Sequence, residues 1–263
     1  IKYTGLGNVT NGLFDIGYAA AWNGSMWVAV GENTTTIIYS YDGIEWIPII
    51  NSNTYINRAY AVVWTGINWI VAGVPAINAV YYSSDGINWV PSVTSLGNTY
   101  RGLATDVKTI GTGSGTQSTT VAVGDADIIY SQDDGLNWTV ASGLPGIGLL
   151  CVAWNGTTWL TGGNSNQLYL SLDGINWSAT SNTPLTMINI RSIAWNGVMW
   201  VVVGDNSSGA IQIYYTTVLN GQSGWTLASP IVVSGSPPVN LWSVIWNGKR
   251  WIAGGVDKNV PQS

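Results

Sequence analysis

The sequence contains no histidine and only one cysteine, Cys151, among its 263 residues. The absence of histidine excludes His-based catalytic triads and His metal sites. A single cysteine excludes an intrachain disulfide, and Cys151 lies in an apolar run that predicts a small buried side chain. Catalysis by a His-based triad and coordination of a metal by His are therefore not expected.

Charged residues are also scarce, since Asp, Glu, Lys and Arg make up only 8% of the chain. The formal net charge is −5, so a nucleic acid partner is not expected. No apolar run approaches about 18 residues, which predicts no membrane insertion. No cofactor is expected, because the chain shows neither a glycine-rich phosphate loop nor a helical pattern. The chain begins with Ile1 without a signal-peptide pattern, which is typical of a processed product or an excised domain.

Tryptophan, in contrast, is abundant, with 16 copies. Five of them open a Trp-Asn-Gly or Trp-Thr-Gly turn: Trp22, Trp64, Trp154, Trp195 and Trp246. Five positions after each turn-opening Trp there is a second Trp. An Asn-Gly pair between two short apolar runs predicts a β-hairpin. A third set closes a second hairpin: Trp46, Trp89, Trp138, Trp177 and Trp225. Only Trp242 lies outside this pattern.

The second hairpins share a Ser-x-Asp-Gly pattern, and we call these segments box turns. They are residues 40–46 (SYDGIEW), 83–89 (SSDGINW), 171–177 (SLDGINW) and 131–138 (SQDDGLNW), the last with one more residue between Asp and Gly. Their aspartates are Asp42, Asp85, Asp133 and Asp173. A short Asp side chain accepts N–H groups of its own turn, Gly adopts positive φ, and Trp packs against the neighbouring sheet. A structural role is therefore predicted for the box turns.

Two hairpins that recur every 40 to 50 residues or so are the signature of β-propeller blades. The sequence predicts an all-β, six-bladed propeller of four-stranded antiparallel blades, folded as one domain over residues 1–263. The predicted blades are 17–50, 60–93, 101–141, 150–180, 191–229, and 241–263 together with 1–13. In the last blade a first hairpin at the C-terminus meets a degenerate second hairpin at the N-terminus, so the two ends are expected to close the ring.

The box turns resemble the Asp-box (BNR) repeat of sialidase-like propellers, Ser-x-Asp-x-Gly-x-x-Trp. Only residues 131–138 have the full spacing, and the shorter form resembles repeats of phage, giant-virus and bacterial surface proteins. The resemblance covers nearly the whole chain and suggests a sialidase, which would use an arginine triad, a Tyr–Glu nucleophile pair and an Asp acid. The Arg-Ile-Pro motif of that family is missing, however, and no Glu is expected near a suitable Tyr.

The face opposite the box turns carries the variable loops, where function usually lies. Four residues each precede a turn-opening Trp by four positions, and they are predicted to belong to a ring at the mouth of the central channel: Tyr18, Tyr60, Arg191 and Trp242. Arg58 and Arg101 are placed near the same mouth. Three loop carboxylates, Asp125, Asp127 and Asp205, are candidate Ca²⁺ ligands, with plain loop residues as the alternative.

Aromatic and cationic side chains at the channel mouth suit the binding of a sugar or planar group without bond cleavage. Glycoside hydrolysis instead needs two carboxyl groups in different environments, or an activated Tyr. We therefore predict a non-catalytic binding or structural propeller at an exposed surface, virion or extracellular, with a glycan or protein as partner. The alternative is a sialidase-like Asp-box glycosidase or a lectin with a pocket at the channel mouth.

Overall fold

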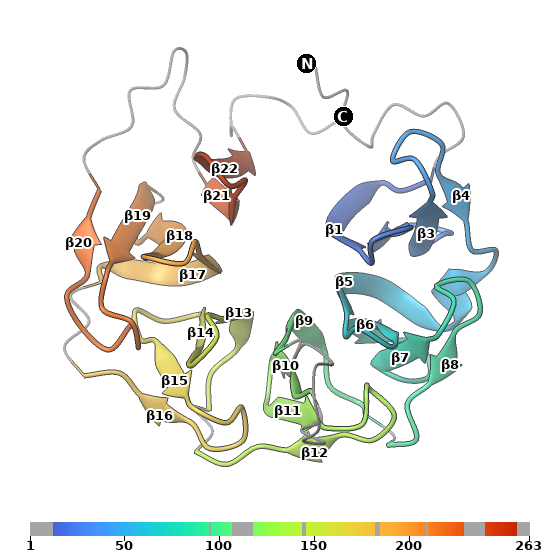
Figure 1. The fold of residues 1–263 in the computed structure, drawn as a ribbon, viewed down its shortest axis with the longest axis horizontal. Coiled ribbons are helices and arrows are strands. Elements are labelled where there is room, and N and C mark those ends of the chain that lie inside the picture. Colours follow the sequence, from blue (N-terminus) through green and yellow to red (C-terminus); the bar gives the residue numbers. More distant parts are fainter. Residues whose placement is uncertain are drawn as a thin grey trace. The chain divides into compact units, whose positions relative to one another are not determined.

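The computed structural model describes residues 13–94, 96–106, 118–143, 146–181, 185–208, 210–228 and 240–256 (Figure 1). Within these ranges the chain forms 22 β-strands, a single 3₁₀ turn at Ser52–Thr54 and no α-helix. None of the described residues forms a helix long and apolar enough to cross a membrane. The predicted all-β class is thereby confirmed.

The strands form two compact units, Ile1–Val140 and Ala141–Ser263. The first unit holds three antiparallel sheets, each with its strands in chain order. The first sheet is β1 (Ile16–Trp22), β2 (Trp27–Glu32), β3 (Ile37–Ser40) and β4 (Ile47–Pro48). The second is β5 (Ile56–Trp64), β6 (Trp69–Pro75), β7 (Val80–Ser83) and β8 (Val90–Pro91). The third is β9 (Tyr100–Thr105), β10 (Thr120–Gly124), β11 (Ile128–Ser131) and β12 (Thr139–Val140).

The second unit also holds three antiparallel sheets. The fourth sheet is β13 (Leu149–Trp154), β14 (Trp159–Gly163), β15 (Tyr169–Ser171) and β16 (Ser178–Ala179). The fifth is β17 (Met187–Trp195), β18 (Trp200–Asn206), β19 (Ile211–Thr216) and β20 (Thr226–Leu227). The sixth contains β21 (Asn240–Trp246) and β22 (Trp251–Val256). Six sheets fit the predicted six blades, whereas the single-domain organisation stays a prediction. Ring closure involves residues 1–12, which lie outside the described residues, and also stays a prediction.

Hydrophobic cores lie between neighbouring sheets of each unit. The second strand of a sheet is buried on both faces, so β2, β6 and β10 are continuous apolar runs rather than alternating ones. Trp69 on β6, which is fully buried, packs with Met26 and Val28 of the first sheet. The outermost strands β4, β8, β12, β16 and β20 have only two residues each, all exposed, and such short edges resist pairing with other chains.

Each Trp-Asn-Gly or Trp-Thr-Gly hairpin is closed by two tryptophans that face each other across the turn. The five pairs, such as Trp154 and Trp159, have ring centroids 4.9–5.3 Å apart. Between them the side-chain oxygen of Asn155 accepts the backbone N–H groups of Thr157 and Thr158, at 2.9 and 2.7 Å. Gly156 has a φ of 102°, a conformation that favours glycine. The Trp periodicity thus arises from repeated cross-strand aromatic pairs.

Two kinds of hydrogen bond recur in all four box turns: the Ser hydroxyl oxygen accepts the glycine N–H, and the Asp carboxylate accepts a backbone N–H further along the turn. In residues 171–177, Ser171 Oγ accepts the N–H of Gly174 at 2.9 Å, and Asp173 Oδ1 accepts those of Ile175 and Asn176, both at 2.8 Å. Burial alone would raise the pKa of Asp173, but these bonds and one from the Asn176 side chain lower it to about 2. The indole of Trp177 donates to Gly174 O at 3.1 Å.

The fifth sheet has no aspartate in its second hairpin, yet it keeps one bond of the box turn. The indole of Trp225 donates to Gly221 O at 2.9 Å, as Trp138 donates to Gly135 O at 3.0 Å in a complete copy. The Thr216 hydroxyl donates to Ser223 O at 2.9 Å and helps to close the turn. This turn thus keeps the Trp-to-glycine bond without the aspartate, whereas the Trp89 indole, in a copy that has the aspartate, makes no such bond.

The first strand of every sheet contains a β-bulge at the same place. One extra residue is inserted between two paired residues: Tyr18, Tyr60, Arg101, Leu150, Arg191 and Trp242. The residue before each bulge pairs with a glycine of the second strand: Gly31, Gly73, Gly124, Gly163, Gly204 and Gly255. A Cβ atom on the first five of these glycines would lie only 1.9–2.3 Å from a carbonyl oxygen in or just before the first strand. The bulge thus requires glycine opposite it.

This close approach predicts a large cost for Gly73→Ala, because the new Cβ would lie 1.9 Å from the backbone oxygen of Arg58. We expect the free energy of unfolding to fall by about 3 kcal/mol. The control is Gly97→Ala, where no atom lies within 4 Å of the new Cβ and the expected change is within about 0.5 kcal/mol. Urea unfolding of both variants tests this, and equal stabilities would contradict the packing argument.

The lowered pKa of Asp173 predicts the direction of the acid response. A carboxylate stabilised in the folded state contributes fully above its unfolded pKa of about 4, and this contribution is lost as the pH falls towards 2. Asp173→Ala should therefore destabilise the protein by about 1–2 kcal/mol at pH 7 and lose less stability than the unaltered protein between pH 4 and 2. Glu45→Ala, in an exposed position of another box turn, is the control and should leave both quantities nearly unchanged. Parallel acid titrations for the two variants would refute this role of Asp173.

Candidate functional site

The bulge places five of the six sequence-predicted site residues at equivalent positions. We call Tyr18, Tyr60 and Arg101 the first row, because they belong to consecutive sheets of the first unit. The second row is Leu150, Arg191 and Trp242, in consecutive sheets of the second unit. An extra residue in a strand redirects its side chain relative to the regular pleat. The placement of these residues around one channel mouth stays a prediction, and Leu150 was not identified from the sequence.

Side chains of the first row contact one another from sheet to sheet. The rings of Tyr18 and Tyr60 meet edge to face with centroids 4.8 Å apart. The guanidinium of Arg101 lies 5.0 Å from the centroid of the Tyr60 ring, within cation–π range. Tyr18 is 38% exposed. The first row is thus a continuous aromatic and cationic strip that is open to solvent at Tyr18.

Two carboxylates hold the first row in place. Glu32 accepts a hydrogen bond from the Tyr18 hydroxyl at 2.9 Å and forms an ion pair with Arg58, the residue two positions before Tyr60. Asp125 accepts two bonds from Arg101, at 2.7 and 3.1 Å. Such bidentate contacts fix the plane of a guanidinium. Arg58, the sixth predicted site residue, is not a bulge residue but reaches the row through Glu32 and the Tyr60 hydroxyl, 3.2 Å away.

The Tyr18–Glu32 bond corrects the sequence analysis, which expected no Glu near a suitable Tyr. The two residues come together because β1 and β2 are antiparallel neighbours, with Gly17 opposite Gly31. The bulge at Tyr18 then brings the phenol to the carboxylate that follows Gly31. Burial, with the hydrogen bond to Glu32 and its negative charge, raises the pKa of Tyr18 well above the usual range. The Tyr18 phenol is therefore neutral at physiological pH.

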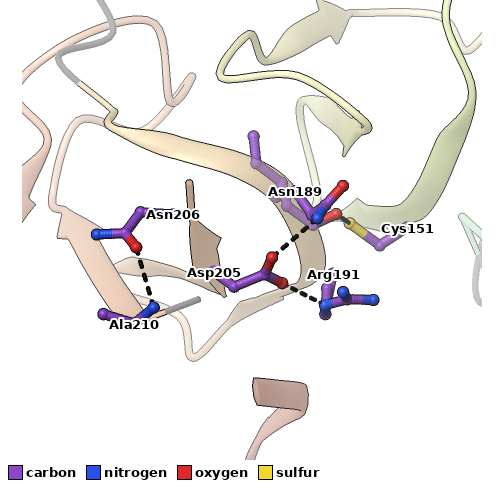
Figure 2. A network of polar contacts seen from close by, with 7 residues as sticks. Cys151, Asn189, Arg191, Asp205, Asn206 and Ala210 are labelled. Carbon is purple, nitrogen blue, oxygen red and sulfur yellow. Dashed lines mark hydrogen bonds and ion pairs between the residues drawn. The ribbon is translucent and has the colours of Figure 1, made fainter. Parts of the chain in front are cut away.

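In the second row, as in the first, an arginine pairs with an aspartate and contacts an aromatic ring, but the ion pair is more buried. Figure 2 shows Asn189 and Arg191 of β17 directed at the carboxylate of Asp205 on β18, with distances of 2.8 Å from Asn189 Nδ2 and 2.5 Å from Arg191 Nε. The side chain of Asp205 is 7% exposed and that of Arg191 17%. The Arg191 guanidinium lies 4.1 Å from the ring centroid of Trp242, which is itself 51% exposed. One cation thus links a buried acid to an exposed indole.

Cys151 directly follows the bulge residue Leu150 in β13. Its sulfur is 3.5 Å from the backbone oxygen of Ile190 and 3.6 Å from that of Gly162. Figure 2 shows Cys151 beside the strand that carries Asn189 and Arg191. Burial raises the pKa of the thiol to about 12, so the group stays protonated. Cys151 is a buried small side chain, as the sequence suggested.

The acidic partners of the bulge residues occupy the same sequence position in each sheet where they occur. In three sheets the residue after the bulge-facing glycine is acidic, and there it contacts the bulge residue: Glu32 with Tyr18, Asp125 with Arg101, and Asp205 with Arg191. In the other three sheets that position holds Val74, Asn164 or Val256, and the bulge residue is Tyr60, Leu150 or Trp242. Sequence reasoning missed Glu32 and Asn189 as partners, although Gly-Glu and Gly-Asp after the second strand were visible signals.

The carboxylates considered as Ca²⁺ ligands are engaged in other contacts. Asp125 and Asp205 pair with arginines, and Asp127 accepts a bond from Asn98 Nδ2 at 2.9 Å. In the part of the chain that the structure describes, no three His, Cys, Asp or Glu side chains lie close enough together to hold a metal ion. Two of the three carboxylates are thus engaged in ion pairs, and Asp127 is engaged by a side-chain amide.

Comparison with known proteins supports the fold. No family model and no curated protein matches the sequence. Among solved structures, the WD40 β-propeller domain of Doa1 matches with a TM-score of 0.64 and 13% identity, over 92% of this chain and 76% of that one. YCF48 from Cyanidioschyzon merolae matches with a TM-score of 0.61 and 14% identity, over 90% and 79%. The computationally designed Ika8 protein gives 0.57 and 12%, over 91% and 68%. The chain therefore has the β-propeller fold, as predicted.

The two arginine–aspartate pairs predict unequal effects on stability. Arg191→Ala leaves the nearly buried Asp205 without its cation, so we expect a loss of about 3 kcal/mol. Arg101→Ala removes a partner of Asp125, whose side chain is 45% exposed, and should cost at most about 1 kcal/mol. Chemical denaturation of both variants measures the difference. An equal or reversed order would show that burial does not control these pairs.

Proposed function

We propose that this chain is a non-catalytic binding propeller of the Asp-box type whose ligand contacts the bulge rows. One observation carries the proposal: all six sheets present a bulge residue at the same register, and five of the six are aromatic or cationic. A bulge repeated at one place next to variable loops is a typical setting for a binding site.

The side chains of the rows favour a glycan as the ligand. Tyr18 and Trp242 are 38% and 51% exposed, so their rings are open to an apolar sugar face, while neighbouring polar groups suit hydroxyls. The ion pairs with Asp125 and Asp205 fix Arg101 and Arg191 before a ligand arrives, which lowers the entropic cost of binding. A protein surface is the alternative partner.

The proposed location is an exposed surface, either of a virion or outside a cell. The resemblance of the short box turns to repeats of phage, giant-virus and bacterial surface proteins supports it. Composition agrees with this, since a chain with 8% charged residues builds its polar surface from Asn, Thr, Ser and Gly.

A sialidase-like glycosidase is the second candidate, because Tyr18 and Glu32 form a Tyr–Glu pair with Arg58 beside them. The first row supplies no free acid to match it, since Arg101 occupies both carboxylate oxygens of Asp125. Binding is therefore favoured over catalysis. A fluorogenic sialoside distinguishes the two: we expect no turnover, and turnover that Tyr18→Phe and Glu32→Gln both abolish would establish the glycosidase instead.

The binding proposal predicts that Trp242→Ala weakens glycan binding by about tenfold or more, because an exposed stacking surface is lost. The matched control is Tyr41→Ala, which removes an aromatic side chain that is 60% exposed in a box turn. Glycan-array binding of the unaltered protein, followed by titration of the best oligosaccharide, measures both. Loss of binding in Tyr41→Ala but not in Trp242→Ala would place the ligand on the box turns.

A further inference from the structure

We infer that the bulge rows select uncharged saccharides and discriminate against acidic ones such as sialylated or sulfated glycans. This inference rests on the proposed binding function and adds the ligand class. The inference follows from the ion pairs that the arginines of the rows, and Arg58 beside them, form with carboxylates of the protein itself.

The charges at the rows are balanced in pairs. Three ion pairs join Arg58 to Glu32, Arg101 to Asp125, and Arg191 to Asp205. Each guanidinium donates through its Nε to a carboxylate of the protein itself. Each internal carboxylate already neutralises the charge that an arginine of a triad would offer to a ligand carboxylate, so the guanidinium N–H groups that remain lie beside a negative charge. The described residues of the rows therefore present no net positive charge to an incoming anion.

Displacing an internal carboxylate is costly, above all in the second row. If a ligand anion took Arg191 from Asp205, a side chain that is 7% exposed would keep only its bond to Asn189. A buried charge that loses its partner carries a large desolvation penalty. In the first row a ligand anion would also approach the carboxylates of Glu32 and Asp125. The repulsion between these negative charges and the ligand disfavours binding of an acidic saccharide.

The groups that remain open suit a neutral sugar. Tyr18 offers an exposed, uncharged ring whose hydroxyl is held by Glu32, and Trp242 offers indole surface beyond its contact with Arg191. Aromatic faces carry partial negative charge, which attracts the weakly positive C–H groups of a sugar ring and repels carboxylates and sulfates. The rows therefore combine stacking surfaces with fixed polar edges and no unpaired cation.

The test uses an array on which each neutral oligosaccharide is printed beside its sialylated and sulfated derivatives. We expect the protein to bind neutral members at least about tenfold more tightly than their acidic partners. Affinity for the best neutral oligosaccharide should change little between about 0.05 and 0.5 M salt, because no ligand charge is involved.

Two charge variants test the cause. Asp125→Asn and Asp205→Asn each leave an arginine without its carboxylate, and together they should raise affinity for acidic members about tenfold while neutral binding persists. Asp134→Asn combined with Glu45→Gln, both in box turns, also removes two negative charges and is the control. Melting curves verify that all variants are folded.

The outcomes separate the inference from the function beneath it. A preference of the unaltered protein for acidic glycans overturns the inference and leaves glycan binding standing. Binding to no glycan at all overturns both. Equal gains in acidic binding for the Asp134→Asn, Glu45→Gln control and for the Asp125→Asn, Asp205→Asn variant would show that overall charge, rather than the paired arginines, sets the selectivity.

Discussion

The structure depends on one backbone contact that recurs in five of the six sheets. Next to the bulge, a carbonyl oxygen in or just before the first strand comes so close to a glycine of the second strand that a Cβ atom there would lie only 1.9–2.3 Å away. Only glycine tolerates that approach. The contact sets the register of the first hairpin and determines which side chain leaves the regular pleat. The rows of Tyr18, Tyr60 and Arg101, and of Leu150, Arg191 and Trp242, are its consequence.

The same contact brings the acids into place. Because Glu32, Asp125 and Asp205 each follow a bulge-facing glycine, they lie beside the bulge residue of their own sheet. These pairs hold phenol and guanidinium groups in fixed positions and neutralise the cations. Each row is therefore aromatic or cationic with its arginine charge balanced, and the proposal of recognition through stacking rather than capture of an anion rests on this.

The sequence predicted the fold well because its strongest signal, the Trp periodicity, reports local hairpins that form wherever Asn-Gly lies between apolar runs. It also predicted the equivalence of Tyr18, Tyr60, Arg191 and Trp242, since each keeps a constant distance from a turn-opening Trp. The Tyr18–Glu32 bond was missed because it depends on the register of two strands and on a bulge. The Arg58–Glu32 pair joins neighbouring sheets, so no local pattern reports it.

The central claim is that ligands meet the bulge residues and not the box turns. The most direct measurement is ¹⁹F NMR of protein labelled with 5-fluorotryptophan, with the Trp242 resonance assigned by its absence in Trp242→Phe. Trp242 is 51% exposed in a bulge, whereas Trp177 is 5% exposed in a box turn. Titration with a bound neutral oligosaccharide should shift the Trp242 resonance most and leave that of Trp177 nearly unchanged. A shift confined to the box-turn tryptophans, with Trp242 unaffected, would contradict the account.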